Sequence, residues 1–104
     1  MKPKKSLGQN FLTDDKILNQ IVNSGNVNSK DVIVEIGPGT GNLTKKIIEK
    51  KPLKLILVEK DKELSKFLNK RFGNKIDIIN DDILNCFSNL KFSKPIKVFG
   101  NLPY

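Results

Sequence analysis

The sequence predicts an α/β fold with a parallel β-sheet in the strand order 3-2-1-4 and helices on both faces. Two observations support this prediction. Short apolar runs alternate with stretches whose apolar residues recur at helical spacing, and the connections between them are short. Strands that alternate with helices in this way form a parallel sheet through right-handed crossovers. The 104 residues allow one domain with a modest core, and a ligand-binding cleft is expected above strands 1 and 4.

The first predicted helix follows a basic lead-in over residues 1–12. Thr13 can cap it, and the two acids that come next suit the positive end of the helix dipole. Gly25 ends the helix. Its apolar face is formed by Ile17, Leu18, Ile21 and Val22.

The first strand, residues 32–36, runs directly into a glycine turn. An apolar run of this kind, cut off by glycine, is typical of a strand that is buried on both faces. The glycines stand at every second position, at Gly37, Gly39 and Gly41. A turn without Cβ atoms lets a ligand approach the backbone closely, and the N-terminus of the next helix offers free N–H groups. This helix runs to about residue 51, before Pro52.

The remaining elements follow the same alternation. They are a strand over 53–58, a helix capped by Asp61 with Leu64, Phe67, Leu68 and Phe72 on its buried face and Gly73 at its end, a strand over 76–79, a short helix with Ile83, Leu84, Phe87 and Leu90 on one face, and a strand over 96–99. The order 3-2-1-4 leaves the last strand as an exposed apolar edge with Ile96, Val98 and Phe99. A finished protein would rarely leave such an edge bare, so we interpret the sequence as an amino-terminal fragment of something larger.

Composition limits the classes of function. The net charge of +8 favours a polyanionic partner, most often nucleic acid, although a general lysine-rich bias is the alternative. The single Cys86 excludes an intramolecular disulfide, and with no histidine there is no Cys/His cluster for a metal. Neither a secretory signal nor a membrane-spanning stretch is present. A monomer in a reducing cytoplasm, not bound to a membrane, is expected.

The details of the glycine turn indicate its ligand. A dinucleotide fingerprint requires glycine at position 42, which is Asn42, and Pro38 removes an N–H that a pyrophosphate could use. The spacing of Glu35 and the three glycines instead resembles motif I of the class I S-adenosylmethionine-dependent methyltransferases, which have a Rossmann-like fold. In those proteins the turn passes close to the methionine part of the cofactor. The alternative is a structural turn in another kind of α/β protein.

Acidic residues follow the second and third strands. Glu59 stands at the carboxyl end of strand 2, where an acid can accept hydrogen bonds from both hydroxyls of a ribose. The alternative for Glu59 is a surface charge. Asp81 and Asp82 follow strand 3, where a carboxylate can accept from the exocyclic amine of adenine while Ile83 packs on the ring. The spacing does not decide between the two aspartates.

The last four residues, Asn101-Leu102-Pro103-Tyr104, match the Asn/Asp-x-Pro-Tyr/Phe motif of methyltransferases that modify exocyclic amines. Such an amine is conjugated with its ring and is therefore a poor nucleophile. An asparagine oxygen and a backbone carbonyl that both accept from the NH₂ group favour a more tetrahedral nitrogen, whose lone pair can attack a sulfonium methyl group. The proline rigidifies the turn, and the aromatic ring stacks on the extruded base.

Three motifs together resemble the ribosomal RNA adenine dimethyltransferase family, which makes N6,N6-dimethyladenosine in small-subunit rRNA. They are Gln9-Asn10-Phe11-Leu12, Glu35-Ile36-Gly37-Pro38-Gly39 and Phe99-Gly100-Asn101-Leu102-Pro103-Tyr104. The resemblance covers the whole chain. It implies that 1–12 is a basic segment with a cofactor-contacting motif and that 13–104 is the amino-terminal half of the methyltransferase domain. Members of the family continue past this tyrosine, complete a seven-stranded sheet and add a small helical RNA-recognition domain.

The resemblance also implies residue roles. For the cofactor, S-adenosyl-L-methionine, these residues are Asn10 and Leu12 in the amino-terminal segment, Gly37 at the methionine part, Glu59 at the ribose, Asp82 at the adenine amine, and Asn101. For the target amine they are Asn101 and the Leu102 carbonyl, with Pro103 shaping the turn and Tyr104 stacking. Lys2, Lys4 and Lys5 would meet phosphates of the partner, the small-subunit rRNA or precursor subunit, or else form a solvated tail.

Three alternatives to a small-subunit rRNA dimethyltransferase share some of these features. The macrolide-resistance methyltransferase that acts on 23S rRNA shares every motif but more often has isoleucine at the position of Leu102. A non-catalytic RNA-binding ribosome-assembly factor could keep the fold, although the intact Glu59, Asn101 and Tyr104 argue against lost chemistry. A nicotinamide dehydrogenase is disfavoured by Pro38, by Asn42 and by the terminal motif.

Overall fold

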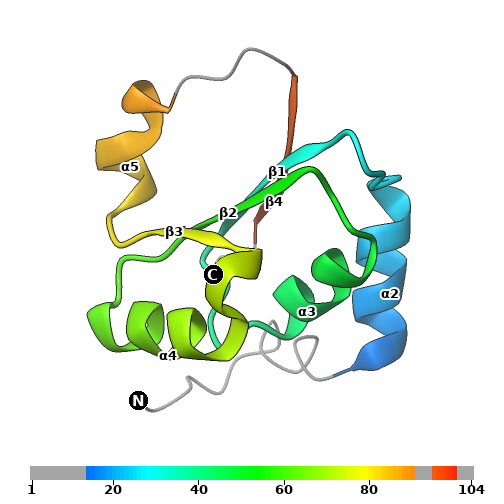
Figure 1. Ribbon diagram of the computed structural model, residues 1–104, viewed down its shortest axis with the longest axis horizontal. Coiled ribbons are helices and arrows are strands. Elements are labelled where there is room, and N and C mark those ends of the chain that lie inside the picture. Colours follow the sequence, from blue (N-terminus) through cyan, green and yellow to red (C-terminus); the bar gives the residue numbers. More distant parts are fainter. Residues whose placement is uncertain (1–13, 91–94, 101–104) are drawn as a thin grey trace.

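A computed structural model describes residues 14–90 and 95–100, in which helices and parallel strands alternate along the chain (Figure 1). The elements are α2 (Asp15–Ser24), β1 (Val32–Ile36), α3 (Asn42–Glu49), β2 (Lys54–Val58), α4 (Lys62–Phe72), the 3-10 turn η1 (Gly73–Lys75), β3 (Asp77–Ile79), α5 (Ile83–Cys86), the 3-10 turn η2 (Phe87–Asn89) and β4 (Ile96–Gly100). No helix within these ranges is both long enough and apolar enough to cross a membrane.

The four strands form one sheet in the order β3-β2-β1-β4, and every neighbouring pair is parallel. The predicted fold class and strand order are therefore confirmed. In the register, Ile36 at the end of β1 lies between Val58 of β2 and Gly100 of β4. All four strands thus end at the same edge of the sheet, where the glycine turn and the acidic residues follow them.

Helices cover both faces of the sheet because β1 and β2 carry apolar side chains in both directions (Figure 1). Ile33 belongs to the larger core cluster, which α2, α3 and α4 complete with Leu18, Val22, Leu43, Ile47 and Leu68. Val34 points to the other face, into a smaller cluster that includes Cys86 and Ile83 of α5. β1 is thus buried on both faces, as its largely apolar run predicted.

Several predicted boundaries differ from the structure. The N-cap of α2 is Asp14, whose Oδ1 accepts from the N–H groups of Lys16 and Ile17 at 3.0 and 3.2 Å, so the prediction of Thr13 was wrong. Helix α3 ends at Glu49 rather than near residue 51, because Lys51 has a left-handed φ of 54° just before the proline. Strands β2 and β3 each begin one residue later than predicted.

Two predicted helix faces also differ. On α4, Leu68 is fully buried as expected, but Phe67 is 46% exposed and Ser65 is buried instead. Ser65 can be buried because its hydroxyl donates to the Glu59 carbonyl at 3.2 Å. Leu84 of α5 is 88% exposed, and Phe87, the first residue of η2, is 60% exposed. The helix is only one turn long, so it packs on the sheet through Ile83 and Cys86.

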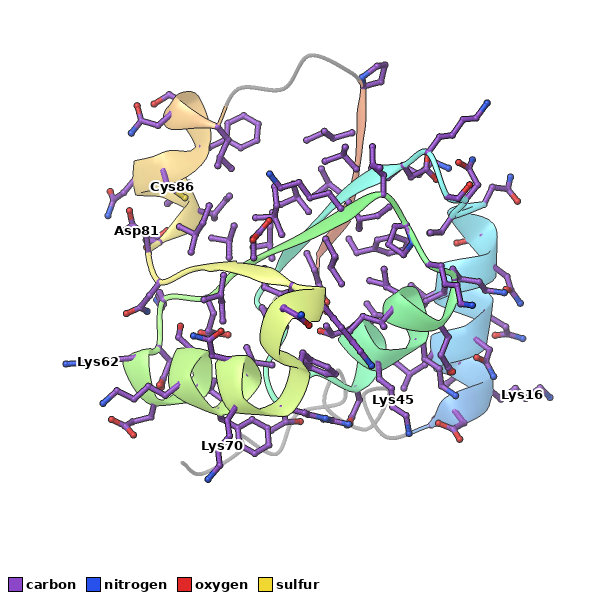
Figure 2. The ribbon with its side chains drawn as sticks, viewed as in Figure 1. Lys16, Lys45, Lys62, Lys70, Asp81 and Cys86 are labelled. Atoms are coloured by element: carbon purple, nitrogen blue, oxygen red, sulfur yellow. The ribbon has the colours of Figure 1, made fainter. Side chains whose placement is uncertain are left out.

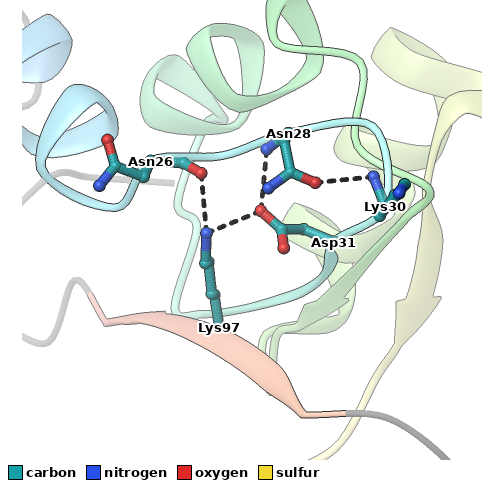
Figure 3. A network of polar contacts seen from close by, with 5 residues as sticks. All are labelled: Asn26, Asn28, Lys30, Asp31 and Lys97. Carbon is teal, nitrogen blue, oxygen red and sulfur yellow. Dashed lines mark hydrogen bonds and ion pairs between the residues drawn. The ribbon is translucent and has the colours of Figure 1, made fainter.

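The predicted apolar edge at β4 is only partly correct. Within the described residues β4 pairs with β1 alone, and Val98 is half exposed. Phe99, however, is buried, because its ring packs over Gly25 at the end of α2. Figure 3 shows a second anchor: Lys97 Nζ lies 2.8 Å from both the Asn26 carbonyl and Asp31 Oδ2. This ion pair lowers the pKa of Asp31 and fixes β4 to the loop before β1.

The contact between Phe99 and Gly25 predicts a stability effect. A Cβ at position 25 would lie 2.6 Å from Phe99 Cζ, although the backbone φ of −82° suits any residue. Gly25→Ala should therefore lower the free energy of unfolding by about 1–3 kcal/mol through overpacking. The measurement is urea unfolding, with Gly100→Ala as control because a Cβ there meets no described residue within 4 Å. Equal effects of the two substitutions would contradict the role of this contact.

Candidate cofactor-binding site

Three predicted site residues lie at the carboxyl ends of adjacent strands. Gly37 follows β1, Glu59 follows β2, and Asp82 comes shortly after β3. Backbone hydrogen bonds continue the sheet into this rim: the Gly37 N–H donates to the Val58 carbonyl at 3.0 Å, and the Glu59 N–H donates to the Ile79 carbonyl at 2.9 Å. The fold thus brings these three positions to one edge in the order in which their strands pair.

The glycine turn has a backbone that few other residues could adopt. Gly37, Gly39 and Gly41 have φ values of 66°, 61° and 93°, in the left-handed region that favours glycine. The turn closes through a hydrogen bond of 3.0 Å from the Gly41 N–H to the Pro38 carbonyl. No side chain caps α3, whose N-cap is Gly41. None of the described residues lies within 4 Å of a Cβ built at Gly39, so residues 14–90 and 95–100 leave the turn open to a ligand there.

Glu59 is held in place by contacts that the sequence did not predict. Its side chain is largely buried, and Oε2 accepts from the Asp61 N–H at 2.9 Å. Its backbone carbonyl accepts from Asn80 Nδ2 at 2.9 Å and from the Ser65 hydroxyl. Asn80 could have been noticed, since it is a polar residue directly after a strand at the same rim. Such fixed placement is what a carboxylate needs in order to accept from two hydroxyl groups together.

The two aspartates after β3 differ in their contacts. Asp81 Oδ1 accepts from the Asp82 N–H at 2.7 Å and so shapes the local turn. Asp82 caps α5, with its Oδ1 accepting from the Leu84 N–H at 2.9 Å. Its second oxygen, Oδ2, accepts no hydrogen bond from the described residues. An amine donor can therefore bind Asp82 without disrupting the cap.

Glu35 belongs to the motif of the glycine turn, but its pattern predicted no role for it. Its carboxylate is completely buried between β1 and α3, and Oε1 accepts from the Thr44 hydroxyl at 2.5 Å. Oε2 has no hydrogen-bond partner among the described residues. Burial raises the pKa of Glu35 to about 7, although the Thr44 hydrogen bond acts in the opposite direction. The sequence signal that could have singled out Glu35 is a carboxylate inside a strand that is predicted to be buried on both faces.

The raised pKa of Glu35 predicts how stability depends on pH. The folded state keeps the Glu35 proton up to about pH 7, whereas the unfolded state loses it near pH 4.5. The tighter proton binding of the folded state therefore stabilises it fully below pH 4.5, and this stabilisation is lost as the pH rises to 7. A shift of this size corresponds to about 3 kcal/mol. We therefore expect urea unfolding to show that, between pH 4.5 and pH 7, the free energy of unfolding of the wild type falls by about 3 kcal/mol relative to that of Glu35→Gln. A constant difference would contradict the assignment.

The other predicted site residues lie outside the described residues and their roles stay predictions. They are Lys2, Lys4, Lys5, Asn10, Leu12, Asn101, Leu102, Pro103 and Tyr104. Strand β4 ends at Gly100, which pairs with Ile36, so the strand before the terminal motif ends beside the strand before the glycine turn. Within residues 14–90 and 95–100, no three His, Cys, Asp or Glu side chains gather as a metal site.

Sequence comparison relates the chain to enzymes that modify ribosomal RNA. The model of a family described as ribosomal RNA adenine dimethylase matches residues 1–104. A ribosomal RNA small subunit methyltransferase A from Pelagibacter ubique is 51% identical over 104 residues, which are 100% of this chain and 39% of that protein. Its counterpart from Wigglesworthia glossinidia brevipalpis is 47% identical over 110 residues, with coverage of 99% and 41%. The chain thus spans about two fifths of these relatives.

Structural comparison also relates the chain to methyltransferases. The crystal structure of the 23S rRNA methyltransferase ErmE superposes with a TM-score of 0.79 at 26% identity, covering 90% of this chain and 38% of that one. A dimethyladenosine transferase from Plasmodium falciparum has a TM-score of 0.72 at 29% identity, with coverage of 88% and 33%. These likenesses confirm the predicted Rossmann-like methyltransferase fold.

Proposed function

The chain belongs to the ribosomal RNA adenine dimethylase family. From this premise we propose that the protein is an S-adenosylmethionine-dependent methyltransferase. The proposed reaction is dimethylation of N6 on two adjacent adenosines near the 3′ end of small-subunit (16S) rRNA during ribosome biogenesis. One observation carries the proposal: the glycine turn, Glu59 and Asp82 follow three adjacent strands at one edge of the sheet. The Glu59 carboxylate is held in place there, and only one oxygen of the Asp82 carboxylate accepts a hydrogen bond from the described residues.

These residues fit the three parts of the cofactor. Gly37 and the open backbone at Gly39 suit the methionine part, Glu59 can accept from the ribose hydroxyls, and Asp82 Oδ2 can accept from the adenine amine. Asn10 and Leu12 complete the proposed contacts from the amino-terminal segment. S-adenosylmethionine supplies a sulfonium methyl group that is electrophilic without a metal ion.

The terminal motif is proposed to prepare the target amine. The side-chain oxygen of Asn101 and the carbonyl of Leu102 accept from its two N–H groups, which favours a tetrahedral nitrogen with an available lone pair. Pro103 fixes the turn, and Tyr104 stacks on the base, which must leave its helix to reach the site. The position of β4 supports this role, because β4 leads the chain to the rim beside β1.

The proposal extends to organisation and partners. Residues 13–104 are proposed to form the amino-terminal half of the methyltransferase domain, and residues 1–12 to be a basic segment that contacts cofactor and rRNA. A net charge of +8 supports a polyanionic partner such as the precursor of the small ribosomal subunit. We propose that the protein acts as a cytoplasmic monomer.

One alternative has a specific observation in its favour. The likeness to ErmE gives the higher of the two TM-scores quoted above, so a 23S rRNA substrate is the second candidate. Leu102 and the similarity to small-subunit methyltransferases A favour the 16S substrate.

Nucleoside analysis of methylated rRNA tests the proposal. The full-length protein is incubated with S-adenosylmethionine and with small subunits or 23S rRNA that lack the modification, and the digested RNA is analysed by mass spectrometry. We expect N6,N6-dimethyladenosine in 16S rRNA alone. Product only in 23S rRNA would favour the second candidate. Absence of product, despite cofactor binding, would favour a non-catalytic assembly factor.

A further inference from the structure

Helix α4 contacts the glycine turn through its last turn. Arg71 Nη1 donates to the Thr40 carbonyl at 2.6 Å, although the two residues are 31 positions apart in sequence. The guanidinium carbon of Arg71 also lies 5.0 Å from the centroid of the Phe72 ring, so the side chain is oriented from two sides. A hydrogen bond from a charged donor is stronger than one between neutral groups.

The end of the turn packs against the same part of α4. A Cβ built at Gly41 would lie 2.5 Å from Phe72 Cε2 and 3.0 Å from Leu68 Cδ2, so the helix leaves no room for a side chain there. At Gly39, by contrast, a Cβ would meet no atom of the described part of the chain within 4 Å. The turn is therefore supported by α4 at Thr40 and Gly41 and is open at Gly39.

The beginning of α4 is linked to Glu59. The N-cap Asp61 follows Glu59 by two residues, and its N–H donates to the Glu59 carboxylate at 2.9 Å. Lys62 and Lys70, labelled in Figure 2, lie near the two ends of the helix. One rigid element thus connects the carboxylate proposed for the ribose with the turn proposed for the methionine part.

We propose that Arg71 is a positioning residue that holds the glycine turn in the conformation that binds the amino-acid part of the cofactor. This inference rests on the proposed function. Three glycines make the turn permissive, and the orientation of the Thr40–Gly41 peptide decides how the turn closes on Pro38. Without the Arg71 hydrogen bond the turn samples other conformations, and binding must then order it at a cost in affinity.

Two ligands that share adenosine and sulfur isolate this effect. S-adenosylhomocysteine carries the amino-acid part, whereas 5′-methylthioadenosine lacks it. In calorimetric titrations of the full-length protein, Arg71→Ala should raise the Kd of S-adenosylhomocysteine about tenfold, the size expected for one hydrogen bond from a charged group. The Kd of 5′-methylthioadenosine should change less than twofold. Arg71→Lys, which keeps a charged donor, should recover part of the lost affinity.

The control is Lys70→Ala, which removes a neighbouring cation that points away from the body of the protein in Figure 2 and should leave both Kd values unchanged. Equal weakening of both ligands by Arg71→Ala, or no weakening of either, would overturn the positioning role. If Arg71→Ala does not fold, Arg71→Lys gives the same comparison with a smaller difference expected. A wild-type protein that binds neither ligand would overturn the proposed function itself, and this inference with it.

Discussion

Asn101→Ala in the full-length protein is expected to reduce kcat for methyl transfer by about 100-fold or more. The proposed role of the asparagine oxygen is to accept from the target amine as the nitrogen becomes tetrahedral. This interaction strengthens in the transition state, so its loss lowers kcat rather than only weakening substrate binding. Alanine cannot accept this hydrogen bond. Single-turnover methylation of small subunits, with cofactor and RNA saturating, measures the effect.

The matched control for Asn101 is Asn19→Ala, which replaces an exposed asparagine on α2 and should leave the rate unchanged. Thermal unfolding of both variants checks that the fold is kept. A rate equal to that of the wild type in Asn101→Ala would remove this residue from the proposed mechanism.

Glu59→Ala is expected to weaken S-adenosylmethionine binding by about 1.5–3 kcal/mol, or about 10- to 150-fold in Kd. The carboxylate is largely buried at the end of β2, and its backbone carbonyl is held by Ser65 and Asn80. A ribose whose two hydroxyls donate to this group would lose both acceptors. Isothermal titration calorimetry measures the change.

Glu59 also has a structural hydrogen bond with the Asp61 N–H, and a second variant separates the two roles. Glu59→Gln keeps an oxygen for the Asp61 N–H but removes the charge, so it should preserve stability and still weaken the cofactor. Glu63→Ala serves as control, because its ion pair with Lys66 is long, at 3.9 Å, and exposed. Unchanged affinity in both Glu59 variants would mean that the ribose is held elsewhere.

Features that depend on neighbours in sequence were predictable. The apolar runs of β1 and β2, the glycines that end β1 and the acid that ends β2 each follow from a strand and the residues directly after it. Parallel pairing then places these ends at one edge, so Gly37, Glu59 and Asp82 could be assigned to a common rim before any coordinates.

Features that depend on contacts between distant segments were not predictable. The burial of Phe99 requires the gap that Gly25 leaves at the end of α2, and the burial of Ser65 requires the hydrogen bond that its hydroxyl donates to the Glu59 carbonyl. The contact of Arg71 with Thr40 likewise joins a helix end to a turn that periodicity does not connect to it. Leu84 and Phe87 were assigned to one short helix with Ile83 but are exposed, because a helix of four residues is too short for its apolar spacing to be informative.

The most direct test asks whether the edge of the sheet formed by Gly37, Glu59 and Asp82 is a methyltransferase cofactor site. The protein is titrated with S-adenosylmethionine and, as a control, with NAD. We expect calorimetric binding of S-adenosylmethionine and no binding of NAD. Binding of NAD alone, in a protein shown to be folded, would contradict the methyltransferase assignment.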